Sequence, residues 1–300
     1  MTALAPIVLF VYNRPGYTLQ TLESLAENIL APQSALFIYA DGPKKNATPE
    51  DLENIDKVRS IVKSKKWCNE VEIIESEINL GLTESIIKGV TEVVNKFGKV
   101  IVLEDDLLFS KYFLNFLNDG LVVYEQEKNV YSVNAYMFPI KTDEIKSFLS
   151  PLGTSTLGWA TWKDRWQFFY KNIPLLNKDI IKSNRFIRSR FNFADYNYAS
   201  MLDSTNSWGI RWYYTVFIRN GLGLFSSKSL VKHIGWGPGA TNAPNEFKQM
   251  DVFDKKIEVS LQSEIDLKIQ SCLLEFFSQP VKKRRSFPQR IMKKLMSFYK

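Results

Sequence analysis

Three consecutive carboxylates, Glu104, Asp105 and Asp106, directly follow the apolar run 100–103. Two like charges about 4 Å apart repel by roughly 1 kcal/mol in water and by about 4 kcal/mol at an effective dielectric constant of 20. A divalent cation would remove this repulsion, and oxygen ligands favour Mg²⁺ or Mn²⁺. Side chains alternate along an extended segment, so Glu104 and Asp106 share one face, and we predict that Asp106 contacts the metal. The alternative is a solvated strand end whose acids precede a helix.

The elements around these acids follow a βαβ pattern. The first 135 residues alternate short β-branched or aromatic runs with longer segments of helical period, which predicts an α/β fold with a largely parallel sheet. The expected strands are 6–12, 35–40, 71–75, 99–104 and 130–134. The expected helices are 17–29, 49–63, 83–97 and 111–127. Thr83 and Ser110 are the candidates for N-terminal caps.

Polar residues follow several of the expected strands. Asn13 and Arg14 follow the first strand, Asp41 follows the second, and the three acids end the fourth. In the commonest doubly wound order the first and fourth strands are neighbours, so we expect these side chains to converge on one edge of the sheet. Neither a GxGxxG nor a GxxxxGK[ST] loop accompanies them, which argues against a dinucleotide or an ATP held by a P-loop.

The segment 151–242 is unusually aromatic. Five of the seven tryptophans lie between residues 159 and 212, namely Trp159, Trp162, Trp166, Trp208 and Trp212. Sugar rings stack on aromatic faces, so the cluster favours an acceptor-binding half. The alternative is that these large side chains build a core.

Four strings carry a resemblance to a known family. They are PIVLFVYNRP at 6–15, YADGPK at 39–44, NLGL at 79–82 and VLEDDLLFSKYFLNFLNDGL at 102–121. Together they resemble the nucleotide-diphospho-sugar glycosyltransferases of the GT-A fold, of a bacterial polysaccharide type akin to the N-acetylglucosaminyltransferase of N-glycan processing. The resemblance spans roughly residues 5–242. It implies a GT-A (Rossmann-like) mixed, mostly parallel sheet flanked by helices.

The resemblance also implies roles for the residues at the sheet edge. Asp106 would bind manganese that bridges the donor diphosphate, while Glu104 and Asp105 would help through water and ribose contacts. Asn13 belongs to the same donor-binding group, and Arg14 and Asp41 would hold the base and ribose. From the residues alone, Arg14 also fits a surface turn before Pro15, and Asp41 fits an ordinary Asp-Gly turn.

Two later strings extend the resemblance. TLGWATW at 156–162 resembles the segment that lines the donor-sugar and acceptor pocket, where Gly158 would permit close backbone approach and Trp159 would offer a stacking face. LVKHIGWGPGATN at 230–242 resembles the family's closing stretch. Its glycines would form a mobile loop over the diphosphate, or an ordinary Gly-Pro connector.

The general base is not identified by the resemblance. Related sequences often have an acid where Asn206 stands and a histidine where Asn242 stands, and an amide cannot act as a carboxylate base. Asp203 and Asp195 are the candidates for the base, with a solvated loop acid as the alternative. His233, the single histidine, is expected to be structural rather than a ligand.

The positive charge of the chain is concentrated at its C-terminus. The net charge is +7, but the tail after Pro280 has eight of the 39 basic residues and no acid, so the remainder has 31 basic and 32 acidic residues. We therefore expect no nucleic-acid partner. In the tail, Phe287, Ile291, Leu295 and Phe298 follow helical spacing with lysines between them. This pattern predicts a basic amphipathic helix on an anionic membrane surface, with a disordered basic tail as the alternative.

The compartment follows from two further observations. Cys68 and Cys272 form no CxxC pair, which fits a reducing environment. The run 7–12 is too short to cross a bilayer, and no charged leader precedes it. The expected location is cytoplasmic, peripheral on the inner face of the cell membrane.

These observations predict a metal-dependent glycosyltransferase. It would transfer a hexose or N-acetylhexosamine from a nucleotide-diphosphate donor, a UDP-sugar by expectation, to a glycan or lipid-linked acceptor in cell-surface polysaccharide or lipopolysaccharide synthesis, with inversion. The expected parts are a nucleotide-sugar-binding half (1–135), an acceptor-binding half of the same domain (136–250) and a C-terminal helical region with a basic tail (251–300). The alternatives are a non-catalytic glycan-binding or membrane-scaffold protein and a sugar nucleotidyltransferase.

Overall fold

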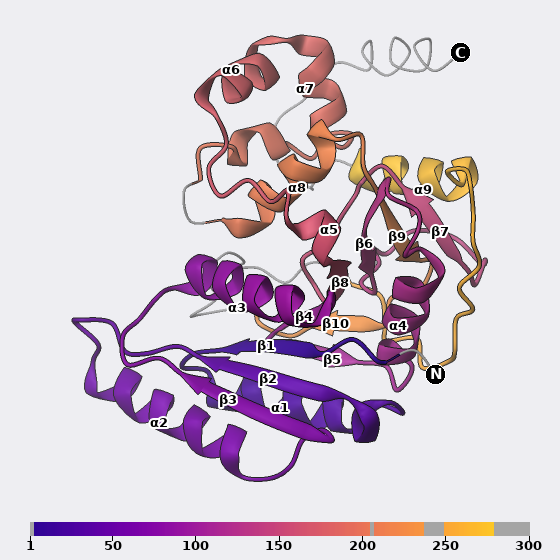
Figure 1. The fold of residues 1–300 in the computed structure, drawn as a ribbon. Coiled ribbons are helices and arrows are strands. Elements are labelled where there is room, and N and C mark those ends of the chain that lie inside the picture. Colours follow the sequence, from indigo (N-terminus) through magenta and orange to yellow (C-terminus); the bar gives the residue numbers. More distant parts are fainter. Residues whose placement is uncertain (1–2, 205–206, 237–248, 279–300) are drawn as a thin grey trace.

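An eight-stranded sheet runs through the molecule (Figure 1). The computed structural model describes residues 3–204, 207–236 and 249–278. The strand order is β3-β2-β1-β4-β8-β6-β9-β7. The strands are β1 Ile7–Val11, β2 Ala35–Ala40, β3 Glu70–Glu75, β4 Lys99–Glu104, β6 Val130–Asn134, β7 Ser147–Ser150, β8 Trp159–Trp162 and β9 Leu222–Ser226. β7 and β8 run antiparallel to their neighbours and the other six strands share one direction, so the predicted mixed, mostly parallel α/β fold is confirmed.

Helices cover both faces of the sheet. They are α1 Pro15–Ala26, α2 Pro49–Lys63, α3 Leu82–Phe97, α4 Phe113–Val123, α5 Lys163–Trp166, α6 Leu175–Ser183, α7 Arg185–Phe191, α8 Trp208–Ile218 and α9 Leu267–Phe277. Two short 3₁₀ turns, η1 Ala31–Gln33 and η2 Tyr198–Met201, complete the described helices. Side chains alternate along β1, so Ile7 and Leu9 pack with α1, α2 and α4, while Val8 and Phe10 pack with α3 and α8. Burial on both faces explains why β1 is a continuous apolar run.

The elements predicted for the first 135 residues are present, with ends that differ by at most four residues. The strand order also places β1 beside β4, as the doubly wound pattern predicts. The predicted caps are wrong, because Gly81 and Tyr112 occupy the N-cap positions of α3 and α4. Another small sheet was not predicted: β5 (Leu107–Phe109) pairs antiparallel with β10 (Val231–His233).

The five tryptophans of the aromatic segment are core residues, so the expectation that they offer faces to a sugar is wrong. Each is at most 4% exposed. Trp159 is fully buried and stacks on Trp208, with ring centroids 5.6 Å apart, and it also lies 5.7 Å from Trp212. Trp159, Trp166, Trp208 and Trp212 fill the space between β8, α5 and α8, whereas Trp162 packs on the other face of the sheet. Burial of such large side chains is a main source of stability.

Within the described residues 251–278, helix is present only in α9, which corrects the expectation of a helical region that begins at residue 251. The segment 251–266 contains no helix and packs against the sheet and α4. Its contacts include a hydrogen bond from the Tyr124 hydroxyl to the Ser260 carbonyl (2.9 Å) and one from the Phe253 N–H to the Ser229 carbonyl (2.8 Å). The predicted amphipathic tail helix lies outside the described residues. No helix in the described ranges has the length and hydropathy that a membrane span requires.

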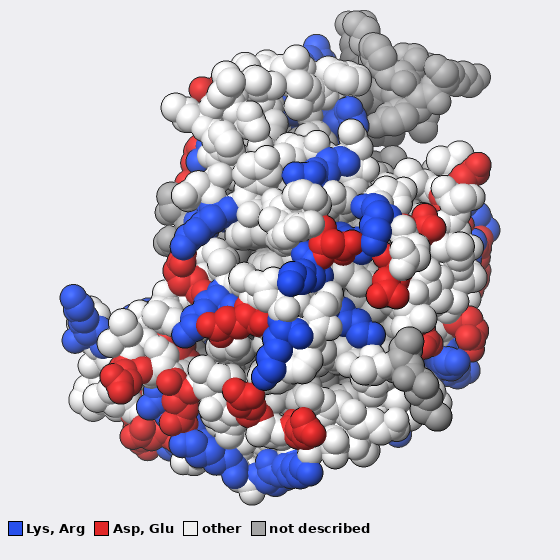
Figure 2. Space-filling view, in the orientation of Figure 1, with Lys and Arg blue, Asp and Glu red and all other residues white. Residues whose placement is uncertain are grey.

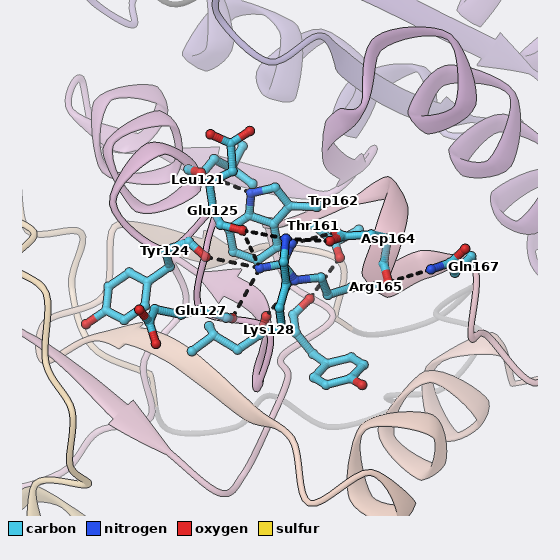
Figure 3. A network of polar contacts seen from close by, with 12 residues as sticks. Leu121, Tyr124, Glu125, Glu127, Lys128, Thr161, Trp162, Asp164, Arg165 and Gln167 are labelled. Atoms are coloured by element: carbon cyan, nitrogen blue, oxygen red, sulfur yellow. Dashed lines mark hydrogen bonds and ion pairs between the residues drawn. The ribbon is translucent and has the colours of Figure 1, made fainter.

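A buried arginine fixes the junction of α4 and β6 (Figure 3). Arg165 is 2% exposed, and its Nη2 donates to the carbonyls of Tyr124 (3.1 Å), Glu125 (2.8 Å) and Glu127 (3.1 Å). Its guanidinium also lies 4.4 Å from the ring centroid of Trp162. A positive charge at the carboxyl end of a helix is favourable, because the last carbonyls have no partner within the helix.

A buried aspartate fixes the turn between β3 and α3. Asp41 Oδ1 accepts hydrogen bonds from the N–H groups of Gly42 (2.9 Å) and Leu80 (2.8 Å). Its Oδ2 accepts from the Gly81 N–H (2.9 Å) and from Asn79 Nδ2 (3.0 Å). A carboxylate has about four acceptor positions, so these four bonds use all of them.

We expect Arg165→Met to lower the free energy of unfolding by about 3 kcal/mol or more, because the buried carbonyls lose their donor. Lys128→Met is the matched control. Lys128 forms an exposed ion pair with Asp164 (2.8 Å), and its loss should cost less than about 1 kcal/mol. Urea unfolding followed by tryptophan fluorescence measures both variants. Equal effects of the two substitutions would contradict the structural role of Arg165.

We expect Asp41→Asn to lower the free energy of unfolding by about 2 kcal/mol, because the amide nitrogen faces N–H donors and leaves them without an acceptor. Asp56→Asn on the exposed face of α2 is the control and should stay within about 0.5 kcal/mol of the parent. Urea unfolding followed by tryptophan fluorescence measures both variants. Unchanged stability of Asp41→Asn would show that the turn does not depend on the carboxylate.

Candidate functional site

The acids at the end of β4 meet Arg14 at the end of β1. The two strands pair in parallel, with Phe10 opposite Glu104, so the residues that follow each strand emerge side by side. Arg14 Nη2 forms ion pairs with Asp106 Oδ2 (2.9 Å) and with Asp105 Oδ1. Pro15 begins α1 directly after Arg14, which fixes where the guanidinium enters the site. The predicted convergence of Arg14 with the acids is therefore present in the structure.

The sheet of β5 and β10 brings a histidine to the same place. His233 is paired with Leu107, the residue after Asp106, and its Nε2 lies 3.2 Å from Asp106 Oδ2. Its Nδ1 has no hydrogen-bond partner among the described residues. The backbone of this segment also contacts Asp106, since the Ile234 N–H donates to the Asp106 carbonyl (2.9 Å).

Gly235 packs directly on the Asp106 carboxylate. A Cβ at this position would lie 2.1 Å from Asp106 Oδ2, closer than any side chain could approach. Only glycine therefore allows the backbone after β10 to pass over the acid without displacing it. Trp236 follows, and its ring lies edge-on to the ring of His233 with centroids 4.3 Å apart.

Burial and mutual repulsion separate the pKa values of the three acids. Burial, followed by the charges of Asp106 and Asp105, raises the pKa of Glu104 to about 8. Burial also raises the pKa of Asp105 to about 6, although Arg14 opposes this rise. Burial acts in the same direction on Asp106, but the hydrogen bond from His233 and the charge of Arg14 outweigh it, so the pKa of Asp106 is lowered. Asp106 is therefore the acid that holds a negative charge most firmly.

The carboxylate oxygens of the acid cluster suit a cation that takes few ligands from the protein. In the described part of the chain, no group of three or more His, Cys, Asp or Glu residues is arranged to hold a metal ion. However, Asp105 and Asp106 share the single guanidinium of Arg14, so negative charge exceeds positive charge in a buried place. Mg²⁺ and Mn²⁺ bind carboxylate oxygens, and Mg²⁺ commonly takes only one or two together with water and phosphate. The chemistry of the site thus fits such an ion, with Asp106 as its carboxylate.

A cavity of about 520 Å³ opens beside this cluster. Arg14 and Gly235, the residues that touch Asp106, are part of its wall. Its other described lining residues are Asn13, Pro15, Gly16, Tyr17, Gln20, Glu50, Asn54 and Trp236. The volume lies within the range of small-molecule sites, about 300–1,000 Å³. The cavity combines two aromatic side chains with amide, carboxylate and guanidinium groups.

Of the other predicted donor-binding residues, Asn13 lines the cavity, whereas Asp41, Gly158 and Trp159 contact other parts of the protein. Asn13 lines the cavity and its Nδ2 donates to Asp51 Oδ1 (2.9 Å). Asp41 uses both oxygens within the turn before α3, so we replace the predicted role at base or ribose with a structural one. Gly158 has φ +67°, and a Cβ at this position would lie 2.9 Å from the ring of Phe113. The backbone of Gly158 therefore packs closely on Phe113. Trp159 is fully buried, which makes its predicted stacking role wrong.

The two candidate bases lie on exposed surface. Asp203 forms an ion pair with Lys182 of α6, and its side chain is 67% exposed. Asp195 is exposed in the segment between α7 and η2. The structure brings neither of them into contact with the acid cluster, and their role as bases stays a prediction. Asn206 and Asn242 lie outside the described residues.

Sequence reasoning did not place His233 beside Asp106, and it did not predict that Gly235, assigned to a loop over the diphosphate, packs on the Asp106 carboxylate. Their position depends on the pairing of β5 with β10, two three-residue strands that are far apart along the chain. The only signal in the sequence was the combination of the single histidine with the glycine-rich string that follows it.

Comparison with known proteins gives matches among solved structures alone: no family model matches the chain, and no curated protein matches it. Two structures of TarS from S. aureus match with TM-score 0.42 and 12% identity over 77% of this chain. The matches span 60% of the structure of TarS 1–349 and 36% of the longer TarS structure. Glucosyl-3-phosphoglycerate synthase from Mycobacterium tuberculosis, in complex with Mn²⁺, UDP and glucosyl-3-phosphoglycerate, matches with TM-score 0.34 and 12% identity, over 61% of this chain and 66% of its own.

Proposed function

We propose that this chain is a metal-dependent glycosyltransferase that uses a nucleotide-diphosphate sugar as donor. One observation carries the proposal: the cluster of Arg14 with the buried Asp105 and Asp106 borders a 520 Å³ cavity at the carboxyl edge of a mostly parallel sheet. Ligands of open α/β sheets bind at this edge. The sequence resemblance of the strings at 6–15 and 102–121 points to the same donor class.

Each wall of the cavity suits one part of such a donor. Arg14 presents a planar group of donors, which matches phosphate oxygens as well as carboxylates. Tyr17 and Trp236 provide aromatic rings for a nucleobase. Asp106 would hold the metal, which when bound supplies positive charge to the diphosphate leaving group. Arg14 itself keeps the diphosphate close to the acids.

The finer parts of the proposal rest on the resemblance and on the sequence. They are a UDP-sugar as donor, a hexose or N-acetylhexosamine as the transferred group, inversion at the anomeric carbon, and a glycan or lipid-linked acceptor of cell-surface polysaccharide or lipopolysaccharide synthesis. A cytoplasmic enzyme that is peripheral on the inner membrane face through its basic tail would meet such an acceptor where it is assembled.

The first experiment is a calorimetric titration with UDP-, GDP- and TDP-sugars, with and without Mn²⁺. We expect base-selective binding that Mn²⁺ strengthens. Asp106→Asn should weaken the Mn²⁺-dependent binding by about 10–100-fold or more, since even the partners of metal ligands contribute this much. Asp56→Asn, on the exposed face of α2, is the matched control, and circular dichroism checks that both variants are folded.

Binding that survives Asp106→Asn unchanged would refute the metal assignment. The products decide between the function classes. A transferase releases nucleoside diphosphate when an acceptor is present, a nucleotidyltransferase forms pyrophosphate, and a glycan-binding or scaffold protein forms neither. The nucleotidyltransferase alternative is disfavoured because the turn after β1 has one glycine and one arginine rather than a glycine-rich basic loop.

Gly235→Ala tests the geometry of the cavity wall. The new methyl group would collide with the Asp106 carboxylate, so we expect donor affinity to fall by at least about tenfold, equivalent to about 1.4 kcal/mol. Gly16→Ala is the control, because it lines the same cavity and a Cβ there has nothing within 4 Å. Isothermal titration of both variants measures the difference, and equal affinities would mean that the backbone of Gly235 does not shape the site.

A further inference from the structure

Helices α6 and α7 form a hairpin whose outer surface combines apolar and basic side chains. On this hairpin Leu175 is 74% exposed, Leu176 and Phe186 are each 68% exposed, and Ile180 is 41% exposed. Soluble proteins expose single apolar residues routinely, but four on two adjoining short helices form a feature that needs an explanation.

The charge of the hairpin is strongly positive. Residues 175–191 contain five basic side chains and a single acid, Asp179. The basic residues are Lys178, Lys182, Arg185, Arg188 and Arg190. Figure 2 shows the lobe at the top of the molecule as largely uncharged surface with scattered Lys and Arg side chains.

The inner side of the hairpin is already used in folding. Phe191 is fully buried, and its ring lies edge-on to Tyr213 of α8 with centroids 5.1 Å apart. The Tyr213 hydroxyl donates to the Phe191 carbonyl (2.8 Å), and Ile181 is 3% exposed. The hairpin is therefore held to the body by its inner face, and Leu175, Leu176 and Phe186 remain mostly exposed.

We propose that the outer face of the α6–α7 hairpin docks on an anionic lipid surface. Interfacial helices place apolar side chains among the acyl chains while basic side chains meet the headgroups. Leu175, Leu176 and Phe186 supply the apolar part, and the excess of lysine and arginine supplies charge complementarity to anionic lipid. The surface is formed by residues 175–191 and so involves a different part of the sequence from the basic C-terminal tail. It does not depend on the proposed transferase activity.

The test is binding of the full chain to vesicles of phosphatidylcholine with 30 mol% phosphatidylglycerol, compared with phosphatidylcholine alone. We expect binding to the anionic vesicles that weakens as salt increases. The triple variant Leu175→Gln, Leu176→Gln, Phe186→Gln should bind at least about tenfold more weakly. The double variant Lys178→Gln, Arg185→Gln should lose about 25-fold, from about fivefold per basic side chain.

A matched control changes three equally exposed apolar residues elsewhere. Ile78, Leu261 and Leu267 are 68%, 61% and 76% exposed, and their joint replacement by Gln should leave vesicle binding unchanged. A second readout places an environment-sensitive fluorophore at Leu176→Cys, in a Cys272→Ser background that leaves only the buried Cys68. Its emission should shift to the blue on anionic vesicles, whereas the same probe at Leu267→Cys should not shift.

Two results would overturn the proposal. One is equal binding of the parent chain and the triple Gln variant, which would assign any membrane affinity to another part of the chain. The other is a change of oligomeric state in the triple variant, seen by light scattering, with unchanged vesicle binding. In that case the hairpin face would be a contact between two copies of the chain.

Discussion

The excess of negative charge at the end of β4 is the constraint around which the site is built. Three adjacent carboxylates are held in a place where burial penalises their ionisation, and Arg14 is the cation that pairs with two of them. The parallel pairing of β1 with β4 makes this possible, because it fixes Arg14 and the acids at one edge of the sheet. Because two carboxylates share one guanidinium, the site has a net negative charge that a further cation would neutralise.

The rest of the fold positions this edge through contacts that lie away from it. The four hydrogen bonds to Asp41 fix the turn from which α3 starts, and α3 covers the face of the sheet formed by Val8 and Phe10. On the far side, Arg165 ties the end of α4 to β6. Neither residue touches the acids, but both hold elements that pack against β1 and β4. Site geometry in this chain is thus an outcome of buried polar contacts as well as of the apolar core.

The sequence predicts the first half of the fold well because its signals are local. β1, β2 and β4 are apolar runs that are buried on both faces, and α1 to α4 have helical periodicity. β5, β7, β8 and β10 have three or four residues each, and their pairing joins distant segments, so periodicity cannot find them. The position of His233 beside Asp106 could not be predicted for this reason. Trp159 was misjudged because composition does not distinguish a buried stack from an exposed one.

Two physically independent arguments distinguish Asp106 from the neighbouring acids. Strand alternation selects Glu104 and Asp106 from their positions, without regard to charge. The structure instead distinguishes them by environment, since the pKa of Glu104 is raised by burial and by its acidic neighbours, whereas His233 and Arg14 lower that of Asp106. Alternation alone could not have separated the pair, because it assigns both side chains to the same face. The nonlocal β5–β10 pairing, which delivers His233 and Gly235 to Asp106, therefore gives this acid an environment that its neighbours lack.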